Sequence, residues 1–400
     1  MTTVRAGVIA GVDTHADTHH AALISDTGQH LADRSFPATP AGYQALAVFI
    51  TSHGPLVRVG VEGTSSYGAG LTRVLLATDM PVVEVIRPAR TNRRRGKSDP
   101  IDAYAAAAAA LANDKLPTPK TSADQVDAIR AVLTVRRSAV KAATATMNQI
   151  HNLLITAPNQ LREQYRTLSG AKLIAALAAQ TADDHHHIRT ALQRLAHRHQ
   201  HLTAEVTAAD TDLDHLTALA NPALRSGYGI GPISAAQLLV TAGDNPDRIT
   251  TDAKLAALCG ISPIPASSGK TNRHRLNRGG DRQANSAFHR IALIRLQHDP
   301  RTKAWAEPRQ TPHNSNNKHI LRCLKRALCR EIHHYLLNPH DIPDITDLRP
   351  LRHTLGLTLA HAAQQLNTTT ATISRLERGQ HRNDHLATTY RTWLHTHPTP

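Results

Sequence analysis

Apolar and polar positions in residues 1–112 follow the pattern of an α/β domain. Residues 8–12 are apolar and end on Asp13, which predicts a buried strand. Further apolar runs predict strands at residues 20–24, 30–36, 57–61 and 82–86. Helical spacing predicts helices at residues 41–52 and 71–76, and another that begins near Asp99. We therefore expect three strands, a helix, a strand, a helix, a strand and a last helix.

In residues 121–221 the pattern becomes helical, and glycine is nearly absent. A first amphipathic helix should end near Pro158, because proline interrupts helical hydrogen bonding. Apolar residues then recur in heptads at Leu192, Leu195, Leu202, Val206, Leu213 and Leu216. This spacing is typical of a coiled coil, and we expect a protruding antiparallel pair that dimerises or reaches along nucleic acid. The alternative is a helix packed within its own domain.

Residues 222–338 are predicted to form a further, mainly α-helical unit. Its segment 227–231 contains three glycines between two helical patterns and has the form of a helix-hairpin-helix. Gly229 and Gly231 would let backbone N–H groups approach a phosphate. A purely structural turn between two helices is the alternative.

A linker at residues 338–344 precedes a tail, residues 346–400, that contains two short helical patterns. Thr358 and Thr369 can cap these helices across a tight turn. The pair resembles the helix-turn-helix of Cro-like repressors, in which the second helix enters the major groove of DNA. Four residues of the second helix would face DNA: Thr370, Ala371, Ser374 and Arg375. A tail with a purely structural role is the alternative.

The net charge of the chain indicates what kind of partner it binds. The formal net charge of +15 and the sequence pI near 10.2 favour a polyanion such as DNA. Three cysteines without a Cys-x-x-Cys pair indicate reduced thiols that act as small buried apolar side chains. No leader opens the chain and no apolar run is long enough to span a membrane, so we expect a cytoplasmic, nucleoid-associated protein. The histidines at 185–187 lack other spaced ligands, and we interpret them as a solvated turn.

Four carboxylates are the main candidate chemistry of the first domain. Asp13 and Glu62 end predicted strands, and Asp99 and Asp102 lie on one face of the first turn of a predicted helix. Ligands in α/β sheets gather at the carboxyl ends of strands, and clustered carboxylates repel one another unless cations are bound. Two Mg²⁺ ions would relieve this repulsion and support phosphodiester chemistry. The alternative for Asp99 and Asp102 is capping of the free N–H groups at the helix start.

Basic residues accompany both this helix and a serine loop farther along the chain, and such clusters suit phosphates. The residues before the helix are Arg90, Arg93, Arg94, Arg95 and Lys97. Those that follow Ser268 are Lys270, Arg273, Arg275, Arg278 and Arg282. A serine hydroxyl is a poor nucleophile until a base or a metal activates it, so Ser268 by itself also fits a solvated loop. Residues 269–271 do not belong to a P-loop, because Ile264 stands where a glycine is required.

Several segments together carry a family resemblance. They are Gly11-Val12-Asp13-Thr14-His15, residues 61–68, residues 97–103, residues 260–269 and residues 276–282. These segments resemble the insertion-sequence-one-ten family of transposases, relatives of the Piv DNA invertases. The resemblance extends over about residues 6–338 and leaves out the tail.

For the first domain, the resemblance implies a RuvC-like fold of ribonuclease-H type. It implies that Asp13, Glu62, Asp99 and Asp102 are metal ligands. It also implies a tetramer on two DNAs, with the acidic domain of one subunit meeting the serine domain of another. A structured noncoding RNA would guide the choice of donor and target.

For the second domain, the resemblance implies that Ser268 attacks the scissile phosphate, with Ser267 as the alternative nucleophile. A phosphoserine bond would result, and the hydroxyl of a second strand would resolve it. Asp281, Ala284 and Asn285 depart from the family pattern, so the helix that supports the serine loop could pack differently.

We therefore expect a DNA transposase or recombinase that acts as a homo-oligomer on donor and target DNA. Two other functions are compatible with the sequence. A RuvC-like junction-resolving nuclease would need the four carboxylates and water but not Ser268. A noncatalytic DNA-binding regulator would depend on the tail and the charge alone.

Overall fold

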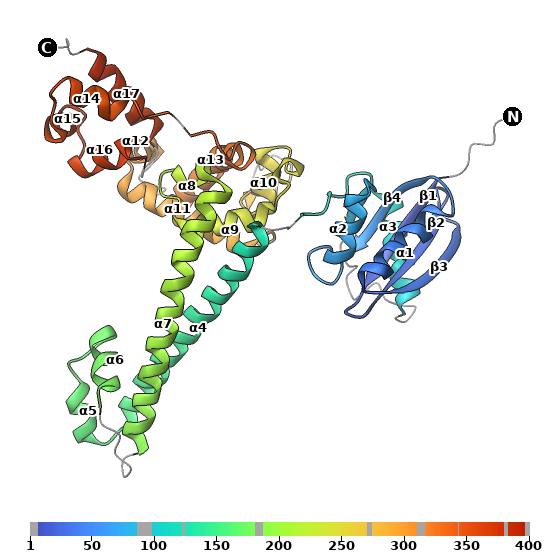
Figure 1. The fold of residues 1–400 in the computed structure, drawn as a ribbon, viewed down its shortest axis with the longest axis horizontal. Helices are drawn as coiled ribbons and strands as arrows, with labels where there is room; N and C mark the ends of the chain where they lie inside the picture. The colour runs from blue at the N-terminus through green and yellow to red at the C-terminus, as the bar shows by residue number, and fades with distance from the viewer. Residues whose placement is uncertain are drawn as a thin grey trace. The chain divides into compact units, whose positions relative to one another are not determined.

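The computed structural model describes residues 7–85, 98–121, 125–180, 187–269, 274–309, 317–342, 344–379 and 383–396. The chain divides into two compact units (Figure 1). The first unit contains residues 1–123 and 243–248, and the second contains residues 124–242 and 249–400. Within the described residues, no helix combines the length and apolar character needed to cross a membrane.

A five-stranded mixed sheet forms the centre of the first unit. Its strands are β1 (Val8–Thr14), β2 (Thr18–Ser25), β3 (His30–Pro37), β4 (Leu56–Glu62) and β5 (Val82–Val85). The order across the sheet is β3-β2-β1-β4-β5. Strand β2 pairs antiparallel with both β1 and β3, whereas β4 runs parallel to β1 and β5 parallel to β4. The predicted α/β class and the predicted order of elements are confirmed.

Helices cover both faces of this sheet. They are α1 (Pro40–Thr51), α2 (Ala69–Ala77) and α3 (Asp99–Ala112). Because side chains alternate along a strand, Val8, Ala10 and Val12 of β1 pack in one core with α1 and α2. Ile9 points the other way and packs against the alanines of α3.

Two glycines let α3 lie unusually close to the sheet. A Cβ atom on Gly11 would lie 2.1 Å from the backbone nitrogen of Ala107 and 2.3 Å from the carbonyl oxygen of Ala103. A Cβ atom on Gly60 of β4 would lie 2.9 Å from the carbonyl oxygen of Ala106. The backbone of α3 therefore rests directly on β1 and β4, which explains why its buried face consists of alanine. This packing fixes the first turn of α3 near the carboxyl end of β1.

An antiparallel helical pair dominates the start of the second unit. Helices α4 (Gln125–Thr156) and α7 (His187–Ala220) run side by side (Figure 1), and Arg136 of α4 forms an ion pair with Asp210 of α7. Helices α5 (Asn159–Tyr165) and α6 (Gly170–Ala178) connect them. At this connected end, Leu192 of α7 is buried in a small core with α5 and α6.

The predicted heptad residues are thus used within one chain. Leu213 is buried in the core shared with α4, whereas Leu195, Leu202, Val206 and Leu216 are half-buried. These contacts within one chain match the alternative prediction, a helix packed within its own domain. An intermolecular coiled coil stays a prediction.

The rest of the second unit is helical, with its own core and a separately packed tail. The body contains α8 (Pro222–Ser226), α9 (Pro232–Ala242), α10 (Asp252–Leu258), α11 (Arg282–His298), α12 (Pro300–Ala306) and α13 (Asn317–Leu337). The tail contains α14 (Leu348–Thr354), α15 (Leu359–Gln365), α16 (Thr370–Glu377) and α17 (Asp384–His395). Leu348, Ile373 and Tyr390 are buried in the core of the tail, and none of them belongs to the core of the body.

Two of the three cysteines are buried as the sequence predicted. All three are free thiols; Cys259 and Cys329 are buried in the core of the body, whereas Cys323 is only half-buried. Burial raises the pKa of both thiols, that of Cys329 to about 12. These two side chains therefore act as small apolar groups and not as nucleophiles.

Candidate active site

The first candidate site lies at the carboxyl end of β1. The side chain of Asp13 is almost completely buried, and its Oδ2 atom lies 3.2 Å from Nε2 of His15. The same nitrogen lies 3.4 Å from Oδ1 of Asp99, at the start of α3. One atom from each residue lies within 4.8 Å of the other two. Residues far apart in sequence thus converge where the strand ends and the helix begins, as the strand-end argument predicted for Asp13 and Asp99.

His15 is a residue that the sequence analysis did not single out. It occupies the turn between β1 and β2, and its backbone N–H donates a hydrogen bond to the carbonyl oxygen of Thr18 at 3.0 Å. The only available signal was its spacing, two residues after Asp13 in the Asp13-Thr14-His15 segment. A turn of this kind brings side chains on either side of it together, which a strand pattern does not reveal.

Glu62 is brought to the same edge of the sheet. Strand β4 pairs parallel to β1 with Val61 opposite Val12, so Glu62 and Asp13 occupy equivalent positions at the two strand ends. The hydroxyl of Thr14 donates a hydrogen bond to the backbone carbonyl of Glu62 at 2.9 Å. Among the described residues, Glu62 and Asp102 are not part of the tight group of three.

Asp102 carries a buried oxygen atom that needs a partner. Its Oδ2 atom has no hydrogen-bond partner within the described part of the chain, and such a group is costly because it has lost its water. Asp102 lies one helical turn after Asp99, on the same face of α3. A bound cation would satisfy this oxygen.

The capping alternative for the two aspartates receives no support from the helix start. Helix α3 begins at Asp99, with Ser98 at the N-cap and Pro100 at the second helical position, so the predicted N-cap was one residue too late. The Ser98 side chain makes no capping hydrogen bond, and Asp99 points its Oδ1 atom toward His15. Two carboxylates and an imidazole form a ligand set that can hold a divalent cation.

The basic loop before α3 cannot be placed beside this site. Arg93, Arg94, Arg95 and Lys97 lie outside the described residues. Their predicted role in binding phosphate therefore stays a prediction.

The two ends of the serine loop in the second unit lie in close backbone contact. Gly260 and Gly280 have positive φ angles of 62° and 78°, and a Cβ atom on Gly280 would lie 2.5 Å from the backbone nitrogen of Gly260. Between them, the short strands β6 (Ile264–Pro265) and β7 (His274–Arg275) pair antiparallel. Ser268 lies exposed between these strands.

The three residues that depart from the family pattern have defined roles at the base of this loop. Asp281 caps α11 through the N–H groups of Gln283 and Ala284, and its other oxygen accepts a hydrogen bond from Thr241 at 2.7 Å. Asn285 donates to the carbonyl oxygens of Cys259 and Gly260 at 2.9 and 3.0 Å, and its own oxygen accepts from Lys325. Ala284 is completely buried. The base of the loop is therefore held by these residues.

Cations near Ser268 are only partly described. Arg275, Arg278 and Arg282 are exposed, which suits them to contact phosphate. Lys270 and Arg273 lie outside the described residues.

The predicted helix-hairpin-helix corresponds to α8, the glycine segment and α9. Gly229 has a φ of 74°, and a Cβ atom added at Gly231 would meet no other atom within 4 Å. Two arginines hold the carbonyl groups of this segment: Arg225 donates to Ile230 and Arg295 donates to Tyr228, both at 2.8 Å. The structural role of the turn is thus evident, and phosphate binding by Gly229 and Gly231 stays a prediction.

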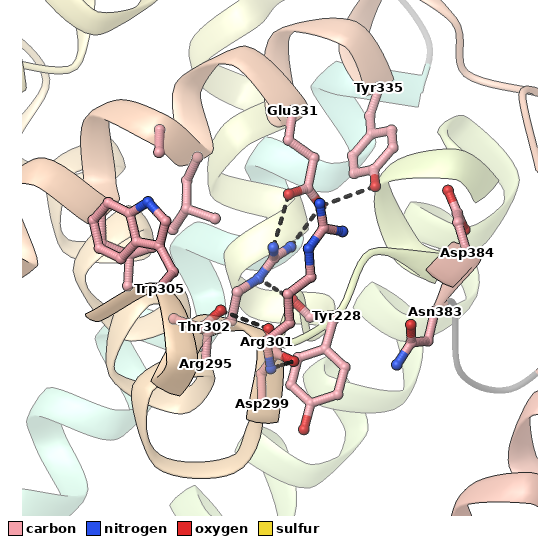
Figure 2. Close-up of a pocket in the computed structure, with 13 residues that line it drawn as sticks. Tyr228, Arg295, Asp299, Arg301, Thr302, Trp305, Glu331, Tyr335, Asn383 and Asp384 are labelled. Carbon is pink, nitrogen blue, oxygen red and sulfur yellow. Dashed lines mark hydrogen bonds and ion pairs between the residues drawn. The ribbon is translucent and has the colours of Figure 1, made fainter. Parts of the chain in front are cut away.

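Arg295 is anchored beneath this segment by a buried ion pair. Figure 2 shows its guanidinium group between Glu331 and Tyr228, with distances of 2.7 and 2.6 Å to the Glu331 oxygens. Burial alone would lower the pKa of Arg295, but the pairing with Glu331 raises it above the ordinary value. The residues border a polar cavity of about 390 Å³.

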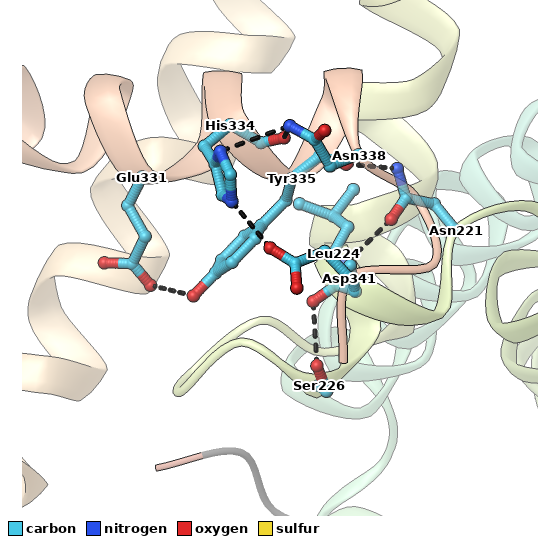
Figure 3. Close-up of polar contacts among 9 residues, drawn as sticks. Asn221, Leu224, Ser226, Glu331, His334, Tyr335, Asn338 and Asp341 are labelled. Carbon is cyan, nitrogen blue, oxygen red and sulfur yellow. Dashed lines mark hydrogen bonds and ion pairs between the residues drawn. The ribbon is translucent and has the colours of Figure 1, made fainter. Parts of the chain in front are cut away.

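A second set of polar contacts ties α8 to α13. Figure 3 shows Asn221, whose oxygen caps α8 at the N–H of Leu224 and whose amide donates to the carbonyl oxygen of Tyr335. The hydroxyl of Tyr335 in turn donates to Glu331 at 2.9 Å. The glycine segment is therefore fixed from both α13 and α11.

In the tail, two short helices are joined by a tight turn, and both predicted caps are confirmed. Thr358 accepts a hydrogen bond from the N–H of His361, and Thr369 accepts one from the N–H of Thr372. On α16, Thr370 and Arg375 are exposed and Ser374 is half-buried. These side chains are accessible, as contact with DNA requires.

Comparison with known proteins identifies the class. Residues 10–157 match the model of the IS110-type DEDD transposase domain, and residues 221–307 match the model described as the transposase IS116/IS110/IS902 family. A protein of insertion element IS900 from Mycobacterium paratuberculosis is 24% identical over 374 residues, covering 80% of this chain and 94% of the relative. A protein of insertion element IS110 from Streptomyces coelicolor is 30% identical over 109 residues, which is 27% of each chain.

These matches define an insertion-element transposase, a class of enzyme that cuts and transfers DNA strands. The two matched segments together span more than half of the chain, and the chain belongs to the IS110 family. The first match contains all four predicted carboxylates, and the second contains Ser268. A DEDD domain also indicates that a divalent metal ion is used.

Proposed function

We propose that this transposase cleaves and rejoins DNA through a phosphoserine intermediate formed by Ser268, with two Mg²⁺ ions held by Asp13, Glu62, Asp99 and Asp102. The observation that carries the proposal is that Asp13 and Asp99 both lie beside Nε2 of His15. In addition, Asp102, which follows Asp99 by three residues on α3, has a buried Oδ2 atom without a hydrogen-bond partner among the described residues. Carboxylates arranged in this way repel one another, and bound cations offset the repulsion.

When bound, the ions would neutralise charge on the scissile phosphate and favour loss of a proton from the attacking hydroxyl. The chain supplies the remaining parts of the reaction. The Oγ atom of Ser268 forms a bond to phosphorus, the bond from phosphorus to the leaving strand oxygen breaks, and the serine proton passes through solvent to that oxygen. A hydroxyl of a second strand then attacks the same phosphorus and releases Ser268.

The close backbone contact between the two ends of the serine loop supports the role of Ser268 as a nucleophile. Gly260, Gly280 and the hydrogen bonds of Asn285 fix the base of the loop while Ser268 stays exposed to a large substrate. A nucleophile that must meet a duplex needs both features. The exposed cations Arg275, Arg278 and Arg282 would hold the phosphates on either side of the scissile one.

The proposal extends to assembly and partners through the family resemblance. The sheet order and the strand-end carboxylates favour a RuvC-like domain of ribonuclease-H type. We propose that this domain and the serine domain meet across subunits of a homo-oligomer, and that a structured noncoding RNA guides the choice of DNA. The tail would add duplex DNA binding through a Cro-like helix-turn-helix, with Thr370, Ser374 and Arg375 facing the major groove.

Trapping of a covalent protein–DNA adduct tests the central step. The full chain is incubated with Mg²⁺, its guide RNA and labelled donor DNA, and adducts are resolved after denaturation. We expect an adduct with the wild type, none with Ser268→Ala, and none with Asp13→Asn. Ser267→Ala is the matched control for the loop, and Asp26→Asn, which removes an exposed turn carboxylate, is the control for charge; both should keep the adduct.

A nuclease of the RuvC type is the second candidate, because the group formed by Asp13, His15 and Asp99 is complete within the first unit. Such an enzyme would use water as the nucleophile. Cleavage by Ser268→Ala at the wild-type rate, without an adduct in either protein, would establish that function and reject the phosphoserine step.

A further inference from the structure

His15 places a ring nitrogen between two of the proposed metal ligands. We propose that His15 is itself a ligand of the ion bound by Asp13 and Asp99, and that its nitrogen makes this position favour first-row transition-metal ions such as Mn²⁺ over Mg²⁺. The inference rests on the proposed function, because it concerns the ion-binding position of the same site.

The distances suit a shared ion. Octahedral coordination at about 2.1 Å puts neighbouring ligand atoms about 3 Å apart. Nε2 of His15 lies 3.2 Å from Oδ2 of Asp13 and 3.4 Å from Oδ1 of Asp99. One nitrogen therefore faces two carboxylate oxygens at the spacing of adjacent ligands.

The three side chains come from fixed backbone. Asp13 belongs to the central strand β1, and Asp99 belongs to the first turn of α3, which packs directly on β1 at Gly11. The backbone of His15 is held by its hydrogen bond to Thr18 across the turn. Ligands that are already in position lose little conformational entropy when the ion binds.

A second observation points to an ion at the same helix start. The Oδ2 atom of Asp102 is buried and has no hydrogen-bond partner within the described residues, although Asp102 lies on the face of α3 that carries Asp99. The side chain of His15 is 36% exposed, which leaves the site open to a phosphate oxygen and water. These are the additional ligands that an octahedral ion would require.

Ligand chemistry then determines which ion is favoured. Mg²⁺ prefers oxygen ligands and gives up water reluctantly, whereas the affinity of first-row transition ions rises when imidazole replaces oxygen. A position with one nitrogen and two or three carboxylates would therefore discriminate between ions more strongly than carboxylates alone. The purely structural role of His15, a hydrogen-bonding bridge between Asp13 and Asp99, predicts no such selectivity.

Pulsed electron paramagnetic resonance on the full chain with Mn²⁺ alone tests the ligand directly. We expect a nitrogen coupling on bound Mn²⁺ that changes when the protein is labelled with ¹⁵N-histidine, which requires no substitution. In His15→Gln the coupling should disappear, and Mn²⁺ affinity should fall by about tenfold or more. Affinity for Mg²⁺, measured by competition, should fall less.

The matched control is His20→Gln. His20 lies opposite Asp13 in the neighbouring strand, but its ring nitrogen pairs with Asp33 at 2.8 Å. This variant should bind Mn²⁺ and retain the nitrogen coupling as the wild type does.

The possible outcomes separate this inference from the proposed function. Bound Mn²⁺ without nitrogen coupling, or coupling that persists in His15→Gln, overturns ligation by His15 and leaves the carboxylate site intact. Failure of the wild type to bind Mn²⁺ or Mg²⁺, or unchanged binding by Asp13→Asn, overturns the metal site and with it the proposed function.

Discussion

At the residue scale, the buried Oδ2 atom of Asp102, which has no hydrogen-bond partner in the described part of the chain, leads to a prediction about stability as well as chemistry. The wild type should gain about 1.4 kcal/mol of unfolding free energy when Mg²⁺ is present at ten times its dissociation constant. Asp102→Ala should lose this gain, while its stability in a chelator stays equal or rises, because a buried group without a partner has been removed. Thermal unfolding with and without Mg²⁺ measures both effects.

The same variant should lose strand cleavage by at least about a hundredfold and keep its affinity for DNA. Asp26→Asn is the control, since its exposed carboxylate should affect neither quantity. Cleavage by Asp102→Ala at the wild-type rate would mean that Asp102 contributes only to capping the start of α3.

A second residue-scale prediction concerns the buried ion pair of the tail. Arg352 and Glu377 are joined by hydrogen bonds of 2.7 and 3.0 Å, and the hydroxyl of Tyr390 donates to Glu377 at 2.7 Å. Burial alone would raise the pKa of Glu377, but these hydrogen bonds outweigh it and lower the pKa below the ordinary value of 4.5. The carboxylate therefore stabilises the folded tail above about pH 4.5, and this stabilisation is lost as the pH falls through the lowered pKa.

Fluorescence of Trp393 can follow this acid transition. The chain has two tryptophans, so Trp305→Phe leaves Trp393 of α17 as the only reporter. In that background, Glu377→Gln should already be destabilised at neutral pH by about 3–5 kcal/mol, because Arg352 is left buried without its partner. Its remaining acid dependence should come from Asp347, whose pKa is lowered by the hydrogen bond from Arg391. An unchanged acid transition in Glu377→Gln would contradict the assigned role of the pair.

At the element scale, the packing of α3 on the sheet depends on Gly11. In Gly11→Ala the new methyl group would meet the backbone of α3 at 2.1 Å, and backbone atoms cannot move aside as a flexible side chain can. We expect a loss of at least about 3 kcal/mol of unfolding free energy, together with weaker metal binding, because the first turn of α3 would shift. Gly231→Ala is the control: the added Cβ atom would meet nothing within 4 Å, so the free energy of unfolding should change little. Denaturant unfolding compares the two variants.

The helical pair makes the next element-scale prediction, which is that it mediates assembly. Aspartate at the heptad positions Leu195 and Leu202 would test this but would also disturb folding, because Leu195 packs against the small core of α5 and α6. Val135 and Val140 of α4 are 46% and 39% exposed, and Val135→Glu with Val140→Glu should shift the protein to smaller species with little loss of helix content. Light scattering measures the mass; an unchanged mass would count against assembly through this face.

These elements also show what sequence patterns could and could not predict. Strand patterns located all five strands, since β1 and β2 are mostly buried and even the largely exposed β3 buries Phe36. The two tail caps followed from single threonines. The heptad pattern predicted a helix but not its partner, since spacing alone does not distinguish a neighbour in the same chain from one in another. His15 escaped notice because its contacts with Asp13 and Asp99 arise from a turn and from the close approach of α3.

At the scale of the whole molecule, the chain combines an α/β unit that carries the four carboxylates and a helical unit that carries Ser268 with a tail that has its own core. The family match ends at residue 307, so the tail is the part whose role must be argued from its residues alone. Its core includes Leu348, Ile373 and Tyr390, and none of these residues packs into the core that contains the serine-loop base. This separation indicates that the tail can be removed without unfolding the loop.

The last prediction is that the tail adds sequence-preferring affinity for duplex DNA and takes no part in the chemistry. Exposed Thr370 and Arg375 on α16 can make a few base-edge contacts, and a single helix-turn-helix usually needs a second copy to bind tightly. A chain that ends at Asp344 should therefore bind duplex DNA about tenfold or more weakly, with a shallower dependence on salt, while Ser268 still forms its adduct on a supplied substrate. Arg375→Ala in the full chain should weaken binding to the preferred sequence, and Arg349→Ala, a substitution outside the proposed recognition helix, is the matched control. If the adduct disappears from a folded truncated chain, the tail belongs to the catalytic assembly; if duplex affinity is unchanged at several salt concentrations, the tail does not read DNA.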